Sequence, residues 1–252
     1  MSATIEDATE GAAESLADHH PIGISTGVFA GSRKEWPVLV DQARSVSTFA
    51  VELSALSGDE LPSLMAYLKA EPRIPFRYVS VHAPVKNHHP DEATSVRQLA
   101  ELPLWVRSVV THPDALADPE RYRVLGTRLV LENLDARKET GRVADEMATF
   151  FDLLPEAGFC LDIAHAHSID PSMAVAQELL DHFRTRLRHV HLSSLQDGHH
   201  VPLTESDEEQ FIDVLGRCRD VPWILEAPPP ERWAEQLKAK SVVTSGTMIF
   251  LG

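Results

Sequence analysis

Residues Phe159–His165 read FCLDIAH, a short apolar run that ends in a carboxylate and an imidazole. The run follows Pro155 and Gly158 and is too short for a typical helix, so it predicts a strand buried on both faces. Seven further runs have the same form. They are Pro21–Thr26, Thr48–Ala55, Tyr78–Ala83, Ser108–His112, Arg128–Asn133, His189–Ser194 and Trp223–Pro228.

Longer amphipathic stretches lie between these runs. Four of them place apolar residues three or four positions apart, which is typical of a helix with one buried face. These four stretches are residues 36–46, 144–154, 172–183 and 208–218. Residues 118–126 (DPERYRVLG) predict only a short, weak helix. Eight strand–helix units over residues 21–252 predict a single α/β domain, a (β/α)8 TIM barrel.

A doubly wound open sheet is the alternative arrangement of alternating strands and helices. That fold usually carries a glycine-rich loop after its first strand, and residues 23–32 (GISTGVFAGS) match such a loop poorly. Residues 1–20 are acidic and lack a core pattern, so they predict a disordered tail in which His20 is solvated. No composition shift follows, and we expect one domain over residues 21–252.

The composition narrows the class of protein further. The 252 residues include 43% apolar residues and carry a formal net charge of −15, which is typical of a globular protein with no general affinity for nucleic acid or anionic lipid. No apolar run approaches the ~18 residues of a membrane span. The first twenty residues lack the apolar segment of a signal peptide. With two cysteines there is no disulfide framework, and we expect a reducing, cytoplasmic location.

Ionisable side chains occur near the carboxyl ends of seven of the eight predicted strands, spaced by about one strand–helix unit. They are Glu52, His82, His112, Glu132, Asp162, His191 and Glu226. All strand ends of this polarity open on one face of a barrel, where active sites form. Because an unpaired buried charge is costly, seven such residues in phase predict a shared site.

The residue types indicate a metal site. Carboxylates combined with several imidazoles suit Zn, Mn, Fe(II) or Co. Asp162 is followed three residues later by His165, and a glycine turn brings Asp197 and His199 back towards the end of the strand that contains His191. By contrast, Cys160 and His189 are expected in the core, and Asn133 is expected to hydrogen-bond near Glu132.

The chain resembles the xylose-isomerase-like TIM-barrel superfamily, which includes sugar phosphate isomerases and epimerases and the endonuclease IV enzymes. The resemblance rests on SVHAP, VVTHPD, LVLENLD, FCLDIAHAH, HVHLSS with DGHH, and WILEAP. It implies the shared metal ligands Glu132, Asp162, His191 and Glu226. The endonuclease IV branch implies five more, namely His82, His112, His165, Asp197 and His199.

A complete set of nine ligands implies two or three divalent ions per chain, with Zn favoured over Mn or Fe. Such a site suits phosphoester hydrolysis, with Glu132, Asp162, Glu226 and His165 as the catalytic residues. One alternative is a single-metal sugar (phosphate) isomerase or epimerase. Another is a multinuclear non-haem iron enzyme, whose family usually has Asn where this chain has His165. A barrel that only binds a ligand is the non-enzymatic alternative.

The expected substrate is a small sugar or sugar phosphate. The loops after the third and fourth strands are shorter than in endonuclease IV enzymes and no basic stripe is visible, so nucleic acid is not expected. Lys86, Arg137 and Lys138 follow strands and are candidates for holding a phosphate or carboxylate, and Glu52 is a further substrate-binding candidate. Barrels of this kind often form homodimers, which we keep as an expectation.

Overall fold

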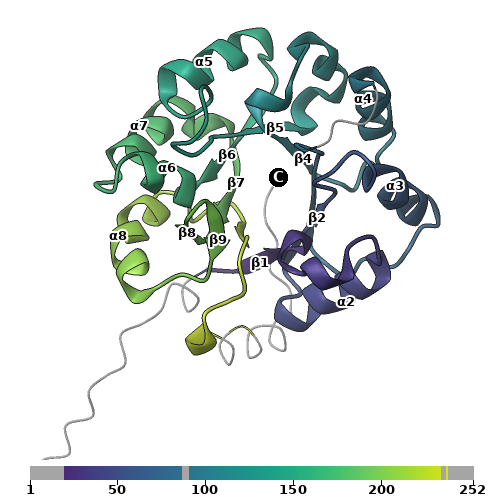
Figure 1. The fold of residues 1–252 in the computed structure, drawn as a ribbon, viewed down its shortest axis with the longest axis horizontal. Helices are drawn as coiled ribbons and strands as arrows, with labels where there is room; N and C mark the ends of the chain where they lie inside the picture. Colours follow the sequence, from purple (N-terminus) through teal and green to yellow (C-terminus); the bar gives the residue numbers. More distant parts are fainter. Residues whose placement is uncertain (1–19, 87–90, 234–236, 238–252) are drawn as a thin grey trace, which may run out of the picture.

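The computed structural model describes residues 20–86, 91–233 and Leu237. Eight described strands form a closed parallel barrel in the order β1-β2-β3-β4-β5-β6-β7-β10 (Figure 1). Their bounds are β1 Ile22–Ser25, β2 Ala50–Ser54, β3 Tyr78–His82, β4 Ser108–Thr111, β5 Leu129–Glu132, β6 Gly158–Asp162, β7 Leu187–Leu192 and β10 Trp223–Leu225. The predicted TIM barrel is confirmed. The doubly wound alternative is wrong, because β1 pairs with both β2 and β10 and leaves no sheet edge.

Helices surround this ring of strands (Figure 1). The α-helices are α2 (Trp36–Val46), α3 (Leu61–Lys69), α4 (Glu92–Ala100), α5 (Ala144–Leu153), α6 (Ile163–Ile169), α7 (Ala174–Phe183) and α8 (Glu205–Gly216). The 3-10 segments are η1 (Thr26–Val28), η2 (Ala30–Ser32), η3 (Pro113–Ala115), η4 (Pro119–Arg128), η5 (Arg184–Arg186) and η6 (Glu231–Trp233). The weak helix predicted before β5 is η4, which Gly126 interrupts with a positive φ of 55°.

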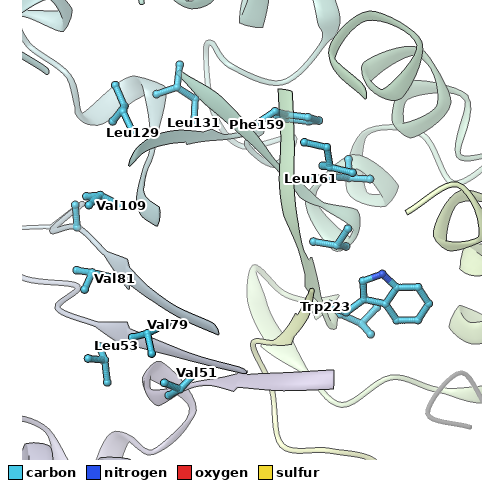
Figure 2. Close-up of a cluster of buried hydrophobic side chains, with 14 of the residues drawn as sticks. Val51, Leu53, Val79, Val81, Val109, Leu129, Leu131, Phe159, Leu161 and Trp223 are labelled. Atoms are coloured by element: carbon cyan, nitrogen blue, oxygen red, sulfur yellow. The ribbon is translucent and has the colours of Figure 1, made fainter. Parts of the chain in front are cut away.

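The two faces of the barrel strands differ in polarity. Alternate residues such as Leu131, Phe159 and Leu161 are fully buried and lie on the helix side of the strands (Figure 2). Their neighbours in sequence, such as Glu132 and Asp162, point to the barrel axis, because successive side chains of a strand point to opposite faces. The outer layer therefore forms the hydrophobic core, and the inner layer is available for polar groups.

A short antiparallel hairpin follows β7. It consists of β8 (Ser194–Gln196) and β9 (His199–Val201), joined by Asp197 and Gly198. Both turn residues have positive φ, at 49° and 77°, as a two-residue hairpin turn requires. The Arg137 guanidinium packs so closely on Gly198 that a Cβ there would lie 1.7 Å from its Nη1 atom. This hairpin brings a second segment of chain to the site described below.

The N-terminal end of the described chain is more ordered than the sequence predicts. His20 is buried, its Nε2 atom lies 2.7 Å from the carbonyl oxygen of Val221, and its ring stacks on Trp223 at 4.0 Å between centroids. The expectation that His20 is solvated is therefore wrong, because the start of β10 lies beside it and offers both an acceptor and an aromatic face. The rest of the predicted tail lies outside the described residues. Within the described ranges, no helix has the length and apolarity that a bilayer crossing requires.

Candidate metal centre

Three adjoining groups of potential metal ligands lie where the strands end. The first is His82, His112 and Glu132; the second is Glu132, Asp162, His191 and Glu226; the third is Asp162, His165 and His200. Within each group, one ligand atom from each residue lies within 4.8 Å of the others. Glu132 and Asp162 each belong to two groups, so the three groups form one continuous constellation.

Glu132 lies at the centre of this constellation and is 1% exposed. Its Oε2 atom is 3.3 Å from His82 Nε2 and 3.6 Å from His112 Nε2. The same oxygen is 3.3 Å from His191 Nδ1, and Oε1 is 3.3 Å from His165 Nδ1. One carboxylate thus contacts imidazoles from β3, β7 and the segments after β4 and β6.

Several ligand atoms are buried without a hydrogen-bond partner. They are Asp162 Oδ2, His191 Nδ1, Glu226 Oε2 and His112 Nδ1. Asp162 illustrates the pattern, because its Oδ1 atom accepts a hydrogen bond of 2.7 Å from the backbone of His165 and caps α6, whereas Oδ2 has no partner. Buried polar atoms are normally satisfied. Three of these atoms, on Asp162, His191 and Glu226, belong to the second ligand group, so the residues fit divalent metal ions.

The electrostatics of the site lead to the same conclusion. Burial raises the pKa of Glu226 well above its usual range, and the nearby Glu132 and Asp162 carboxylates raise it further. Burial opposes protonation of His165, but the Asp162 and Glu132 carboxylates raise the pKa of this imidazole to about 10. Clustered carboxylates of like charge attract positive charge, whether protons or metal ions.

Backbone and amide groups fix the orientation of the candidate ligands. The Nδ1 atom of His82 lies 2.9 Å from the Ala83 carbonyl oxygen, and His165 Nδ1 lies 2.9 Å from the Asn133 carbonyl oxygen. The side chain of Asn133 donates to the Asp162 carbonyl at 2.9 Å and accepts from the Asp162 amide at 2.8 Å. Such contacts define which ring nitrogen remains free for a metal.

The hairpin brings His200, and not its neighbour, to the third group. His200 Nδ1 lies 2.8 Å from Ser193 Oγ and 3.5 Å from Glu226 Oε2. Asp197 and His199 are exposed and belong to none of the groups among the described residues. Adjacent residues of β9 point to opposite faces, and the register pairs Leu195 with His200. The Asp-Gly turn signal in the sequence could have located this hairpin, but not its inward face.

The four predicted substrate-binding residues lie in different environments. Glu52 is fully buried inside the barrel, beneath the strand ends. Arg137 forms a bidentate ion pair with Asp135 at 2.8 and 2.9 Å, and Lys138 contacts Asp114 at 2.6 Å. Lys86 is exposed just after β3. Of these four, only Lys86 combines a location at the open face with a charge that no described acidic side chain pairs.

Asp135 is a further residue of the site that sequence reasoning missed. It is 3% exposed, and its Oδ2 atom lies 4.0 Å from His165 Nε2. Hydrogen bonds from Arg137 lower the pKa of Asp135 to about 2. Its position three residues after Glu132, in the LENLD segment, is the signal that could have identified it.

Comparison with known proteins relates this architecture to others. Residues 78–240 match the sequence profile of a family described as "Xylose isomerase-like TIM barrel". None of the curated proteins compared with the chain matches it. The solved structure of endonuclease IV from Thermus thermophilus is similar, with 21% identity, a TM-score of 0.53, and coverage of 89% of this chain and 97% of that one.

Two sugar-converting enzymes have similar structures. An L-ribulose 3-epimerase shares 14% identity with a TM-score of 0.51, covering 92% of this chain and 89% of that one. A sugar phosphate isomerase/epimerase from Parabacteroides distasonis shares 10% identity with a TM-score of 0.52, covering 94% of this chain and 97% of that one. At these identities the likeness establishes the barrel fold, and the chemistry has to be argued from the site.

Proposed function

The chain belongs to the xylose isomerase-like TIM-barrel family, and on this basis we propose that it is a multinuclear metalloenzyme that hydrolyses a phosphoester. The observation that carries this proposal is the sharing of two carboxylates. Glu132 belongs to the first and second ligand groups, and Asp162 to the second and third. An enzyme that needs one ion has no use for two further ligand groups that adjoin the first.

The proposed ligands follow the three groups. His82, His112 and Glu132 would hold one ion, and Glu132, Asp162, His191 and Glu226 a second. His165, His200 and Asp162 would hold a third, in which His200 replaces the Asp197 and His199 expected from the resemblance. Imidazole and carboxylate ligands favour zinc, and manganese or iron can bind to the same ligand types. The carboxylates of Glu132, Asp162 and Glu226 would supply three negative charges to these ions.

Bound divalent ions would supply the positive charge that polarises a phosphoester and acidifies a water molecule. The chain's own residues would bind and orient the reactants. Glu226 is the proposed proton acceptor, because its side chain is 13% exposed, whereas that of Glu132 is 1% exposed. The contact of His165 Nδ1 with the Asn133 carbonyl would orient this ring and leave Nε2, which lies 4.0 Å from Asp135 Oδ2, free of a hydrogen bond.

The proposed substrate is a small phosphorylated molecule such as a sugar phosphate. The net charge of −15 disfavours the long polyanion of DNA as a substrate. Lys86 is the proposed phosphate contact. Arg137 and Lys138 stay secondary candidates, because a substrate would have to compete with Asp135 and Asp114 for them.

Metal analysis joined to a phosphoester assay tests this proposal. We expect two or three equivalents of zinc in untagged protein by inductively coupled plasma mass spectrometry, and turnover of sugar phosphates that chelators abolish. Asp162→Asn should lose metal and activity together. Asp213→Asn, an exposed residue of α8, is the matched control and should lose neither. A chain that binds no metal even after reconstitution would contradict the proposal.

A single-metal epimerase is the second candidate. It is supported by the second ligand group, which has two glutamates, one aspartate and one histidine, and by the fold similarity to L-ribulose 3-epimerase. His112→Ala separates the two functions. Epimerisation should survive this change at a reduced rate, whereas hydrolysis at a multinuclear site should be lost. One equivalent of manganese or cobalt would favour the epimerase, and stoichiometric iron would direct attention to oxidative chemistry.

A further inference from the structure

The interior of the barrel is polar one layer below the open face. Cys160 precedes Asp162 by two residues on β6, and His189 precedes His191 by two residues on β7. Residues two apart on a strand share a face and lie ~6–7 Å apart along it, so both side chains point to the axis beneath the metal centre. TIM barrels usually fill this space with branched apolar side chains.

We propose that Cys160, His189 and Glu52, together with His191, form a further metal site inside the barrel, which adjoins the open-face centre through His191 and takes a thiophilic divalent cation such as zinc. This site goes beyond the proposed function, which uses no cysteine. All four residues are fully buried. Ligand atoms of Cys160, His189 and His191 lie within 4.8 Å of one another.

Glu52 completes the site from the opposite wall. It belongs to β2, and its Oε2 atom lies 3.6 Å from His189 Nε2. Its Oε1 atom lies 3.3 Å from His191 Nε2. Glu52 therefore lies against both histidines of the Cys160, His189 and His191 group, and it is the proposed fourth ligand. A tetrahedral set with one sulfur, two nitrogens and one oxygen is a donor combination that zinc accepts.

Two atoms in this volume lack the hydrogen bonds that burial demands. His189 Nε2 and Glu52 Oε1 are buried and have no hydrogen-bond partner. Each belongs to a side chain with no exposure, so water outside the protein cannot satisfy it. Glu52 and His189 thus each keep one unsatisfied atom, as ligands of a shared cation would.

The surrounding hydrogen bonds orient these ligands as in known metal sites. His189 Nδ1 lies 2.8 Å from the hydroxyl of Tyr78, which lies 2.7 Å from Ser108 Oγ. Ser80 donates to Glu52 Oε2 at 2.9 Å. Metal-bound imidazoles characteristically bond through their other nitrogen to a second group, and metal-bound carboxylates accept hydrogen bonds in the same way. The outer contacts of the proposed site are therefore already in place.

Charge balance also supports a cation. The Cys160 thiolate and the Glu52 carboxylate together carry two negative charges, which one divalent ion neutralises in a volume where an unpaired charge is costly. His191 faces both sites, with Nδ1 towards Glu226 at 3.4 Å and Nε2 towards Glu52. To bind an ion at each nitrogen, this ring would give up its N–H proton and bridge the two sites as an imidazolate. The sulfur ligand distinguishes the interior site chemically from the open-face centre.

Cobalt substitution tests the interior site without reliance on activity. The full chain would be unfolded, freed of metal and refolded with Co(II), so that the interior is filled before the barrel closes. We expect a thiolate-to-cobalt charge-transfer band in the near ultraviolet. None of the ligands proposed at the open face is a cysteine, so this band reports the interior site alone.

Two cysteine variants make the assignment specific. Cys160→Ala should lose the band and one equivalent of metal. If the alanine variant does not fold, the near-isosteric Cys160→Ser should show the same two losses. Cys218→Ala, the matched control, should keep both, because Cys218 is buried elsewhere with its Sγ atom 3.4 Å from the Val214 carbonyl oxygen.

The outcomes separate this inference from the proposed function. Asp162→Asn should remove open-face metal and leave the charge-transfer band in place. Wild-type protein that binds cobalt without a charge-transfer band would overturn the interior site, while leaving the open-face centre intact. An unchanged metal count in a folded Cys160→Ala variant, verified by circular dichroism, would overturn it as well.

Discussion

The outer and inner faces of the same barrel strands have opposite roles. On β5 and β6, Leu131, Phe159 and Leu161 face the helices and are fully buried among apolar neighbours (Figure 2). Glu132 and Asp162, one residue away, face the axis and gather imidazoles. Adjacent residues of one strand thus serve different purposes, because one stabilises the fold and the next belongs to the candidate metal site. The comparison teaches that substitutions on the two faces should affect different measurements, and the predictions below test this.

The largest expected effect is on the inner face. Glu132→Gln removes the charge shared by two ligand groups, so we expect metal content to fall and activity to drop on the order of 10³-fold or more. The apoprotein should stay folded, because the change removes a buried charge without altering the shape of the side chain. Metal analysis, steady-state kinetics and circular dichroism check this. Glu209→Gln, exposed on α8, is the control, and an equal loss there would contradict the comparison.

The outer face should affect stability instead. Phe159→Ala removes a fully buried ring that packs against Phe151 and Phe183, with centroids 6.3 and 5.8 Å away. We expect a loss of about 3–5 kcal/mol in unfolding free energy, with metal content per folded molecule unchanged. Denaturant titration measures the unfolding free energy, and metal analysis of the folded protein measures the metal content. Leu153→Ala, on the half-exposed side of α5, should lower the unfolding free energy far less. A loss of metal from folded Phe159→Ala would contradict the separate roles of the two faces.

A smaller effect on metal binding is expected from Asn133, whose side chain holds the backbone of the ligand Asp162. Asn133→Ala removes two hydrogen bonds to the backbone of Asp162 without removing a ligand. We expect metal affinity to fall by ~10–100-fold, as for other residues that orient metal ligands. Competition with a chromogenic chelator gives the affinity. Wild-type affinity in the variant would show that β5 and β6 alone hold Asp162 in place.

The metal-free protein should show a pH dependence that originates on the inner face. His165 titrates at an ordinary pKa of 6.5 when unfolded and at about 10 in the folded chain, because the Asp162 and Glu132 carboxylates outweigh its burial. A raised pKa gives stability that is complete below about pH 6.5 and is lost as pH rises through about 10. Denaturation of apoprotein across this window should show the decline. His165→Gln should make the decline shallower, because the raised pKa values of His82 and His191 remain, and His182→Gln, exposed on α7, should leave it unchanged.

The smallest expected effect lies in the hairpin above the barrel. Gly198 has a φ of 77°, and a Cβ there would meet the Arg137 guanidinium. We expect Gly198→Ala to cost about 1 kcal/mol, since the flexible arginine can move but the backbone strain remains. Gly31→Ala is the control, because a Cβ at Gly31 meets nothing within 4 Å. Equal melting temperatures of the two variants would show that the turn tolerates a side chain.

Much of this protein follows from the sequence by itself. The eight apolar runs predict the strands because a run buried on two faces is a local property of composition and length. The polar residues at the strand ends predict a shared face, because parallel strands in a barrel all end on one side. Seven ionisable residues could be assigned to one site for this reason, and the resemblance to the superfamily then implied Glu132, Asp162, His191 and Glu226 as its shared ligands.

Only the tertiary structure decided the contacts that depend on barrel closure and hairpin register. His191 and Glu52 are 139 positions apart, and they meet because β2 and β7 face each other across the axis. The choice between His199 and His200 depends on which face of β9 turns inward. The ion pairs of Arg137 and Lys138 depend on where neighbouring loops pass. Strand alternation is readable along the chain, whereas distances across a barrel arise only when all eight strands are in place.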